Sequence, residues 1–176
     1  MAEKMKIAIA QMDCVVGDDE ANLAKIRSLT EKAHDLGCDI IVFPEMVDTG
    51  YDMDAIRQFA SSWDDSSFQT VSRLANDLQI HIICGISERE NDHIYNSSAV
   101  FNPAGELIGS YRKSHLADYP PLNEGSVITP GNALRTVEIN GIKFGLMICY
   151  DLRFPEISRA LALQGVEVLV LCSAWP

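Results

Sequence analysis

The stretch Asp39-Ile40-Ile41-Val42-Phe43-Pro44-Glu45 decides the fold, because four consecutive apolar residues lead into a proline and a carboxylate. An unbroken apolar run of this length is typical of a short strand whose two faces are both buried. The run closes at Pro44, since proline lacks the N–H that a ladder hydrogen bond needs. We therefore expect a strand at 39–43, in a sheet that other layers cover on both sides.

The residues before this strand predict a β-α-β unit. Residues 6–13 are mostly apolar and predict a first strand. Between about 18 and 36, acidic residues lead the first turn, Gly37 follows the last turn, and apolar residues recur at helical spacing, namely Ile26, Leu29, Ala33 and Leu36. These features indicate a helix. The fold class is therefore α/β.

Turn signals divide the rest of the chain into further strands and helices. Asn102-Pro103-Ala104-Gly105 and Asn140-Gly141 are turn sequences that separate apolar runs. Residues 117–133 form a loop rich in Pro and Gly. We expect helices at about 67–78 and 155–164, and strands at 81–87, 94–101, 107–112, 134–139, 142–148 and 166–172.

The composition is that of one globular domain over residues 1–176. The chain has 176 residues, of which 47% are hydrophobic, enough for a real core. Its formal net charge of −11 opposes binding to phosphate backbones and anionic lipids, so we expect no nucleic acid and no membrane partner. The late apolar run at 166–172 contains Glu167 and is too short to span a bilayer.

Cysteine usage and the chain ends indicate a cytoplasmic protein that is part of a larger domain. The five cysteines are odd in number and form no C-x-x-C pair, which argues against a disulfide scaffold or a zinc ribbon. The charged start is followed by an apolar stretch too short for a signal peptide. The chain stops at Ala174-Trp175-Pro176, directly after an apolar strand whose edge would be uncovered. We therefore expect the fold to be incomplete at its C-terminal end.

Three segments with reactive side chains follow predicted strands. They are Phe43-Pro44-Glu45-Met46, Tyr111-Arg112-Lys113-Ser114-His115-Leu116, and the eight residues from Cys149 to Glu156, Cys-Tyr-Asp-Leu-Arg-Phe-Pro-Glu. Ligand-binding and catalytic residues of α/β folds gather at strand ends. The three segments are therefore candidates for one common site.

Cys149 is the candidate nucleophile, because it ends a predicted strand shortly before a predicted helix. A cysteine on such a turn projects its sulfur near the positive end of the helix, where we expect the thiolate to be favoured. The backbone N–H of Tyr150 would then face a developing oxyanion. A lone cysteine at a strand end is more often a packing residue, and we interpret Cys14, Cys38, Cys84 and Cys172 in that way.

The combination of residue types points beyond packing. Glu45 and Lys113 are each ordinary surface charges by default. Together with Cys149 they supply a base, a cation and a nucleophile, which is the set that hydrolysis of a C–N bond requires. The four histidines are scattered and offer no metal-ligand cluster.

These segments resemble the three motifs of the nitrilase superfamily of carbon–nitrogen hydrolases. Phe43-Pro44-Glu45 is similar to its glutamate motif, 112–116 to its lysine motif and 149–156 to its cysteine motif, in the same order. Glu124 in Leu122-Asn123-Glu124-Gly125 is similar to a further glutamate that many members carry. The resemblance covers nearly the whole chain and is closest to the ω-amidase and Nit-type amidase branch.

The resemblance implies an α-β-β-α sandwich, a homodimer or higher homo-oligomer, and hydrolysis of a small-molecule amide without metal or cofactor. It implies that Glu45 is the general base and that Lys113 stabilises the tetrahedral intermediate with the Tyr150 N–H. It further implies that Glu124 orients Lys113 and the substrate, while Cys149 forms a thioester and releases ammonia.

Arg153 is a candidate for binding a substrate carboxylate. It lies four residues after Cys149, and an arginine can hold a carboxylate with two parallel hydrogen bonds. In carbamoylase relatives, an arginine that matches this position binds the substrate carboxylate. The competing interpretation is an ion pair with Glu156 or Asp151 that stiffens the turn. The favoured substrates are therefore small carboxylate-bearing ω-amides.

Three alternatives remain open on the sequence. N-carbamoyl amidases and true nitrilases of the same superfamily often differ around the cysteine, but both activities stay open. His115, two positions after Lys113 in the sequence, would lie on the same face of a strand and pair with Cys149, as in papain-like proteases. Alternatively, the chain is a non-catalytic fragment or scaffold that keeps the motifs without the assembled site.

Overall fold

The computed structural model describes residues 4–174, apart from the side chain of Ser66. The charged start at Met1–Glu3 and the closing Trp175 and Pro176, on which the expectations about the chain ends partly rested, lie outside the described residues. None of the helices in the described part is long and apolar enough to cross a membrane.

The first sheet has five strands in the order β1-β2-β3-β4-β5. They are Ile7–Ile9, Ile40–Val42, His81–Glu90, His93–Phe101 and Leu107–Arg112. β1 and β2 run parallel, as the β-α-β pattern predicted, and β3 is parallel to β2, whereas the β3–β4 and β4–β5 pairs are antiparallel. The second sheet has three strands, β6 (Thr136–Ile139), β7 (Ile142–Ile148) and β8 (Val168–Cys172), with β7 in the middle.

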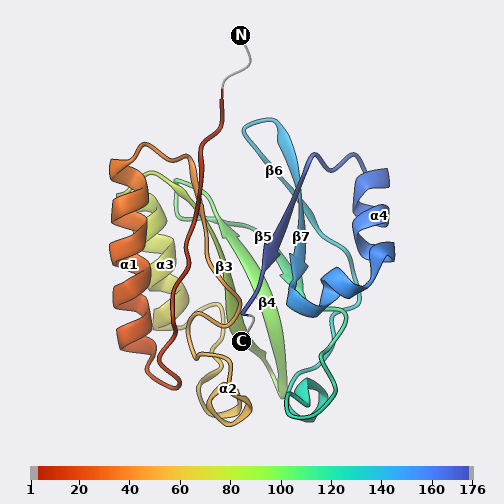
Figure 1. Cartoon of the computed structure of the whole chain (residues 1–176). Helices are drawn as coiled ribbons and strands as arrows, with labels where there is room; N and C mark the ends of the chain where they lie inside the picture. Colours follow the sequence, from red (N-terminus) through yellow and green to blue (C-terminus); the bar gives the residue numbers. More distant parts are fainter. Residues whose placement is uncertain (1–3, 175–176) are drawn as a thin grey trace.

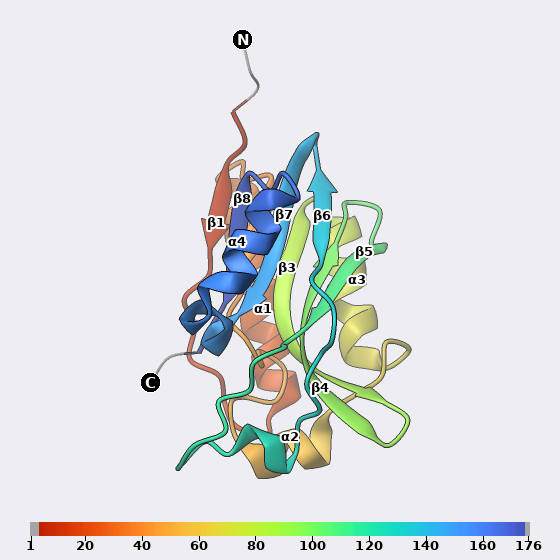
Figure 2. The ribbon, with the colours of Figure 1, turned by 90° about the vertical axis from the view of Figure 1, so that its right-hand side faces the viewer.

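The layers form the α-β-β-α sandwich that the resemblance implied (Figure 1). Helices α1 (Asp19–Asp35) and α3 (Ser66–Asp77) cover the outer face of the first sheet, and Ile26 and Leu74 contribute to that core. Helix α4 (Pro155–Leu163) lies over β7 and β8 in Figure 2, where Ile157 and Leu161 pack with Met147.

The core between the two sheets explains the unbroken apolar strands. Ile83, Val100 and Tyr111 of the first sheet belong to one buried cluster with residues of β7, namely Phe144, Leu146 and Ile148. A strand between helices on one side and a second sheet on the other has no solvent face. Its residues are therefore apolar on both sides.

Several boundaries differ from the expectation, and one helix was missed. β1 is limited to Ile7–Ile9, whereas β3 extends to Glu90 and meets β4 after a two-residue turn. Helix α2 (Met53–Phe59) is short and was not expected. Its start signal is Asp52, whose side chain accepts hydrogen bonds from the N–H groups of Asp54 and Ala55 at 3.0 and 2.9 Å.

Candidate active site

The side chains of the four residues proposed for catalysis lie together. Glu45 follows β2, Lys113 follows β5, Glu124 opens the short 3₁₀ helix η1 (Glu124–Ser126), and Cys149 opens η2 (Cys149–Arg153) after β7. Their exposed fractions are 1%, 0%, 0% and 9%. The sequence predicted Glu45, Lys113 and Cys149 at strand ends, whereas Glu124 was expected only from the resemblance, and the fold brings all four together.

Lys113 lies between two carboxylates. Its Nζ is 2.8 Å from Glu124 Oε1 and 3.5 Å from Glu45 Oε1. Burial lowers the pKa of Lys113, but the charges of Glu45 and Glu124 more than offset that effect, so the pKa lies above its usual value. The lysine is therefore a fixed positive charge in a water-poor environment.

Glu45 is held from two sides. Its Oε1 accepts a hydrogen bond from Asn96 Nδ2 at 3.1 Å, and its Oε2 accepts one from the Ala174 N–H at 3.1 Å. Burial raises the pKa of Glu45 above its usual value, and the Lys113 charge only partly opposes this rise. A carboxyl with a raised pKa is better able to accept and return a proton near neutral pH.

Glu124 has three further donors besides Lys113. The Tyr51 hydroxyl donates to Oε1 at 2.8 Å, Asn96 Nδ2 lies 3.5 Å from the same oxygen, and the Ala117 N–H donates to Oε2. Burial and the Glu124 charge raise the pKa of Tyr51, so its hydroxyl stays protonated and donates. Glu124 is thus fixed in position and saturated with donors.

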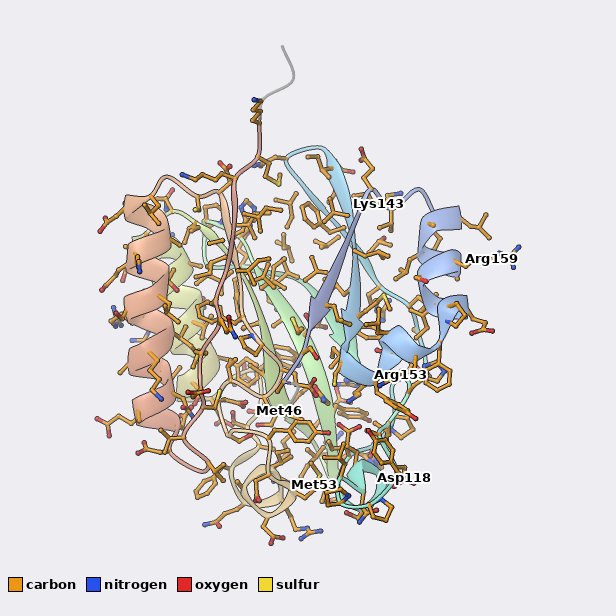
Figure 3. The ribbon with its side chains drawn as sticks, in the orientation of Figure 1. Met46, Met53, Asp118, Lys143, Arg153 and Arg159 are labelled. Carbon is orange, nitrogen blue, oxygen red and sulfur yellow. The ribbon has the colours of Figure 1, made fainter. Side chains whose placement is uncertain are left out.

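The backbone is strained at or beside three of the four residues. Cys149 itself has φ = +42°, Met46 next to Glu45 has +52°, and Asn123 before Glu124 has +46°. Non-glycine residues rarely adopt such angles, and they gather at sites where a side chain must point in a particular direction. Met46 lies near the centre of the molecule in Figure 3 and is fully buried.

The expectation that the Cys149 thiolate is favoured is wrong. Burial, followed by the Glu45 charge, raises the pKa of Cys149 to about 12. The physical reason is that helix α4 begins only at Pro155, after the intervening η2 turn, whereas a carboxylate lies beside the sulfur. The resting group is therefore a neutral thiol, which needs a base at the moment of attack.

Asp151 anchors the turn that carries Cys149. Its Oδ2 accepts hydrogen bonds from the Tyr111 hydroxyl at 2.8 Å and the Ile148 N–H at 3.1 Å. Its Oδ1 accepts the His115 N–H at 3.0 Å. The His115 ring stacks on Phe154, with centroids 3.8 Å apart. His115 is therefore part of the support of this turn.

Two glycines allow the site residues to lie close to the sheet. A Cβ at Gly85 on β3 would lie 2.3 Å from Glu45 Cα and 2.7 Å from the Pro44 carbonyl oxygen. A Cβ at Gly131 would lie 2.1 Å from the Arg112 carbonyl oxygen, directly before Lys113. Because these contacts are with backbone atoms, any larger residue would displace Glu45 or Lys113.

Tyr150 and Arg153 lie on the same turn as Cys149. The Tyr150 ring is 5.6 Å from the rings of both Tyr119 and Phe154. As the second residue of η2, Tyr150 is at a position where the N–H lacks an intrahelical acceptor. Arg153 is the exposed last residue of η2 and lies beside α4 in Figure 3.

Sequence reasoning missed Asn96 and Tyr51. Asn96 was detectable, because Asn96-Ser97-Ser98 places three polar residues inside an otherwise apolar strand. Tyr51 lies in a loop and carried no comparable signal. Among residues 4–174, no group of three or more His, Cys, Asp and Glu side chains is arranged to hold a metal ion.

Comparison with known proteins matches residues 6–176 to the carbon-nitrogen hydrolase family. Omega-amidase NIT3 of Saccharomyces cerevisiae is 32% identical, with 99% of this chain and 65% of that protein covered. A nitrilase of Pyrococcus abyssi is 33% identical, with 94% and 63% covered. The crystal structure of S. cerevisiae Nit3, described as a member of branch 10 of the nitrilase superfamily, matches with a TM-score of 0.88 and 32% identity over 97% of this chain and 65% of that one. The chain thus spans less than two thirds of the length of these relatives.

Proposed function

Because this chain belongs to the carbon–nitrogen hydrolase family, we propose that it hydrolyses a non-peptide C–N bond of a small amide. The products are a carboxylic acid and ammonia, and the intermediate is a thioester on Cys149. The observation that carries the proposal is the buried cluster of Glu45, Lys113 and Glu124 beside that thiol. A base, a fixed cation and a nucleophile within one water-poor site are the groups that amide hydrolysis requires.

In the first half of the reaction, the thiol attacks the amide carbon. Glu45 takes the Sγ–H proton, the S–C bond forms, and the carbonyl oxygen becomes an oxyanion. The Lys113 ammonium and the Tyr150 N–H stabilise that charge. When the tetrahedral intermediate collapses, the C–N bond breaks and the protonated Glu45 returns its proton to the leaving nitrogen, so ammonia departs and a thioester remains.

In the second half, Glu45 takes a proton from a water molecule that attacks the thioester carbon. Lys113 stabilises the second oxyanion, the C–S bond breaks, and the sulfur recovers the proton from Glu45. Glu124 Oε1 lies 2.8 Å from Lys113 Nζ, so Glu124 keeps the ammonium in position in both halves of the reaction. A Glu45 pKa above its usual value suits both transfers, since the group must accept and return a proton.

We propose small carboxylate-bearing ω-amides as the substrate class. The relative from S. cerevisiae is named an omega-amidase. In a chain with net charge −11, an anionic substrate needs a local cation, and Arg153 is exposed on the same turn as Cys149. A nitrile or an N-carbamoyl compound is the alternative substrate, and the relative from P. abyssi that is named a nitrilase supports keeping the nitrile in the test.

We further propose that the protein assembles as a homodimer or higher homo-oligomer in the cytoplasm. Two strongly exposed leucines, Leu152 at 57% and Leu163 at 77%, lie on η2 and α4 and support a contact there. Light scattering of the purified chain measures its oligomeric state. Mass spectrometry of the same sample establishes which residues the chain contains.

The test is ammonia release from succinamate, butyramide, butyronitrile and N-carbamoyl-β-alanine, with Cys149→Ala as the control. We expect turnover of succinamate by the wild-type chain and none by Cys149→Ala. Rapid acid quenching followed by peptide mass spectrometry should find one acyl adduct, on Cys149.

An adduct on Cys14, Cys38, Cys84 or Cys172 would contradict the assignment of the nucleophile. Preference for butyronitrile would identify the protein as a nitrilase, and preference for N-carbamoyl-β-alanine would identify it as an N-carbamoyl amidase. A folded chain that turns over none of the four compounds would favour the non-catalytic scaffold.

A further inference from the structure

We propose that Asn96 is a positioning residue of this site, which orients the Glu45 carboxylate toward the Cys149 thiol and favours its ionised form. The inference rests on the proposed role of Glu45 as the base. Asn96 does not contact the reacting atoms in the proposed mechanism, so its effect is exerted through Glu45.

The position of Asn96 in the sheet brings it beside both catalytic carboxylates. It lies within β4 with no exposed surface, and its backbone carbonyl accepts the Lys113 N–H at 2.8 Å. Its Nδ2 donates to Glu45 Oε1 at 3.1 Å and lies 3.5 Å from Glu124 Oε1. One amide group therefore faces two oxygens that also face Lys113.

The charge balance of the cluster shows why a neutral donor is useful. The site holds two carboxylates and one ammonium, and the Cys149 thiol is neutral at rest because its pKa is raised to about 12. A second ammonium would cancel the remaining negative charge, and with it the basicity that Glu45 needs. The Asn96 amide stabilises the Glu45 carboxylate by hydrogen bonding and adds no charge.

The other end of the amide indicates that Asn96 does not serve stability. Asn96 Oδ1 is buried and has no hydrogen-bond partner among the described residues. An unsatisfied buried acceptor destabilises a fold. The amide cannot be reversed to relieve this, because Oδ1 would then face carboxylate oxygens. An apolar residue of similar size would therefore be tolerated by the fold but not by the site.

The groups around Glu45 come from every element packed against it. They are Lys113 after β5, Glu124 on η1, Cys149 on η2, Tyr51 before α2 and the buried thiol of Cys172 on β8. Loss of the Asn96 donor leaves all of these in place. If the reactivity of Cys149 is measured as a function of pH, any shift on the low-pH side of the profile, its acid limb, can then be assigned to the missing hydrogen bond.

The experiment measures alkylation of Cys149 by iodoacetamide as a function of pH, by peptide mass spectrometry. In this reaction the S–C bond forms, iodide leaves and the thiol proton passes to Glu45, so no amide substrate is needed. Asn96→Leu removes the donor at similar size, and Asn96→Asp removes it and adds a charge. Ser98→Ala is the matched control, because Ser98 is equally buried two residues along the same face and contacts Cys172 instead, with Oγ and Sγ 3.4 Å apart.

We expect the acid limb to move to higher pH by about one unit in Asn96→Leu, since a hydrogen bond to a charged group is typically worth that much. The shift should be larger in Asn96→Asp and absent in Ser98→Ala, while Cys14 and Cys38 serve as internal references. An unchanged pH profile in both Asn96 variants would overturn the proposal, as would loss of the fold in both. If the profile shifts but no amide is hydrolysed by the wild type, the proposed function fails and the role of Asn96 stands.

Discussion

Asp151 Oδ1 accepts the backbone N–H of His115 at 3.0 Å and lies 3.2 Å from the ring nitrogen Nδ1 of the same residue. The loop that begins at Lys113 is thereby joined to the turn that begins at Cys149. The imidazole has a carboxylate partner and a stacking partner in Phe154. This arrangement supports a structural role for His115, against the papain-like pairing with Cys149 that the sequence left open.

We expect His115→Ala to retain amide turnover within about tenfold of the wild type while lowering the free energy of unfolding by about 1 kcal/mol, the size of one hydrogen bond. Asp151→Ala should have the larger effect, because it leaves the N–H groups of Ile148 and His115 without their acceptor and removes one partner of the Tyr111 hydroxyl. Steady-state kinetics and denaturant unfolding measure the two quantities. Complete loss of turnover in a folded His115→Ala protein would restore the histidine to the mechanism.

Lys113→Met should lower kcat at least about 100-fold, because removal of an oxyanion-stabilising group typically costs about 3 kcal/mol. An effect confined to KM would assign the lysine to substrate binding alone.

The same variant should make stability depend more steeply on pH. The folded-state pKa of Glu45 is already above its usual value, so its contribution to stability is fully present below that usual value and is lost as pH rises through the raised one. Without Lys113, which lowers this pKa, the loss should grow. The stability deficit of Lys113→Met in denaturant unfolding should therefore be larger at pH 8 than at pH 5, and adding Glu124→Gln should reduce it. An equal deficit at both pH values would contradict the buried charge balance described above.

Gly85→Ala should abolish turnover and destabilise the protein, because the new Cβ would meet the backbone of Pro44 and Glu45 at less than 3 Å. Gly109→Ala on β5 is the matched control, since its Cβ would meet only the Val137 side chain, at 3.4 Å. Kinetics and thermal unfolding of both variants test the difference. Full activity of Gly85→Ala would mean that the segment carrying Glu45 can move without loss of function.

Arg153→Lys should weaken turnover of succinamate far more than that of butyramide, because a lysine cannot form the two parallel hydrogen bonds of an arginine–carboxylate pair. The ratio of the two kcat/KM values measures this preference and is independent of the amount of active protein. An equal loss on both substrates would indicate that Arg153 stabilises its turn, and the preference for anionic amides would lose its local support.

The sequence by itself determined the layers of the fold and the position of three reactive residues within it. An unbroken apolar run such as 40–43 indicates a strand with no solvent face wherever it occurs. Glu45, Lys113 and Cys149 each follow a predicted strand, and strand ends are local features of sequence. For that reason the α/β class, the β-α-β start and the candidate nucleophile could be predicted. Helix α2 could not, since a seven-residue helix has too few turns to show a period.

Only the tertiary structure determined which side chains of the site contact one another and how burial and neighbouring charges shift their pKa values. Tyr51 and Glu124 lie 73 positions apart in the chain, yet their oxygens are 2.8 Å apart, because strand register and loop packing bring them together. The same applies to Asn96, whose Nδ2 reaches Glu45 from 51 positions away. The shift in the pKa of Cys149 was predicted in the wrong direction. That prediction rested on the helix that follows Cys149, which can be recognised from the local sequence. Burial and the charge of Glu45, which follows another strand, arise only in the folded chain, and both raise the pKa of Cys149.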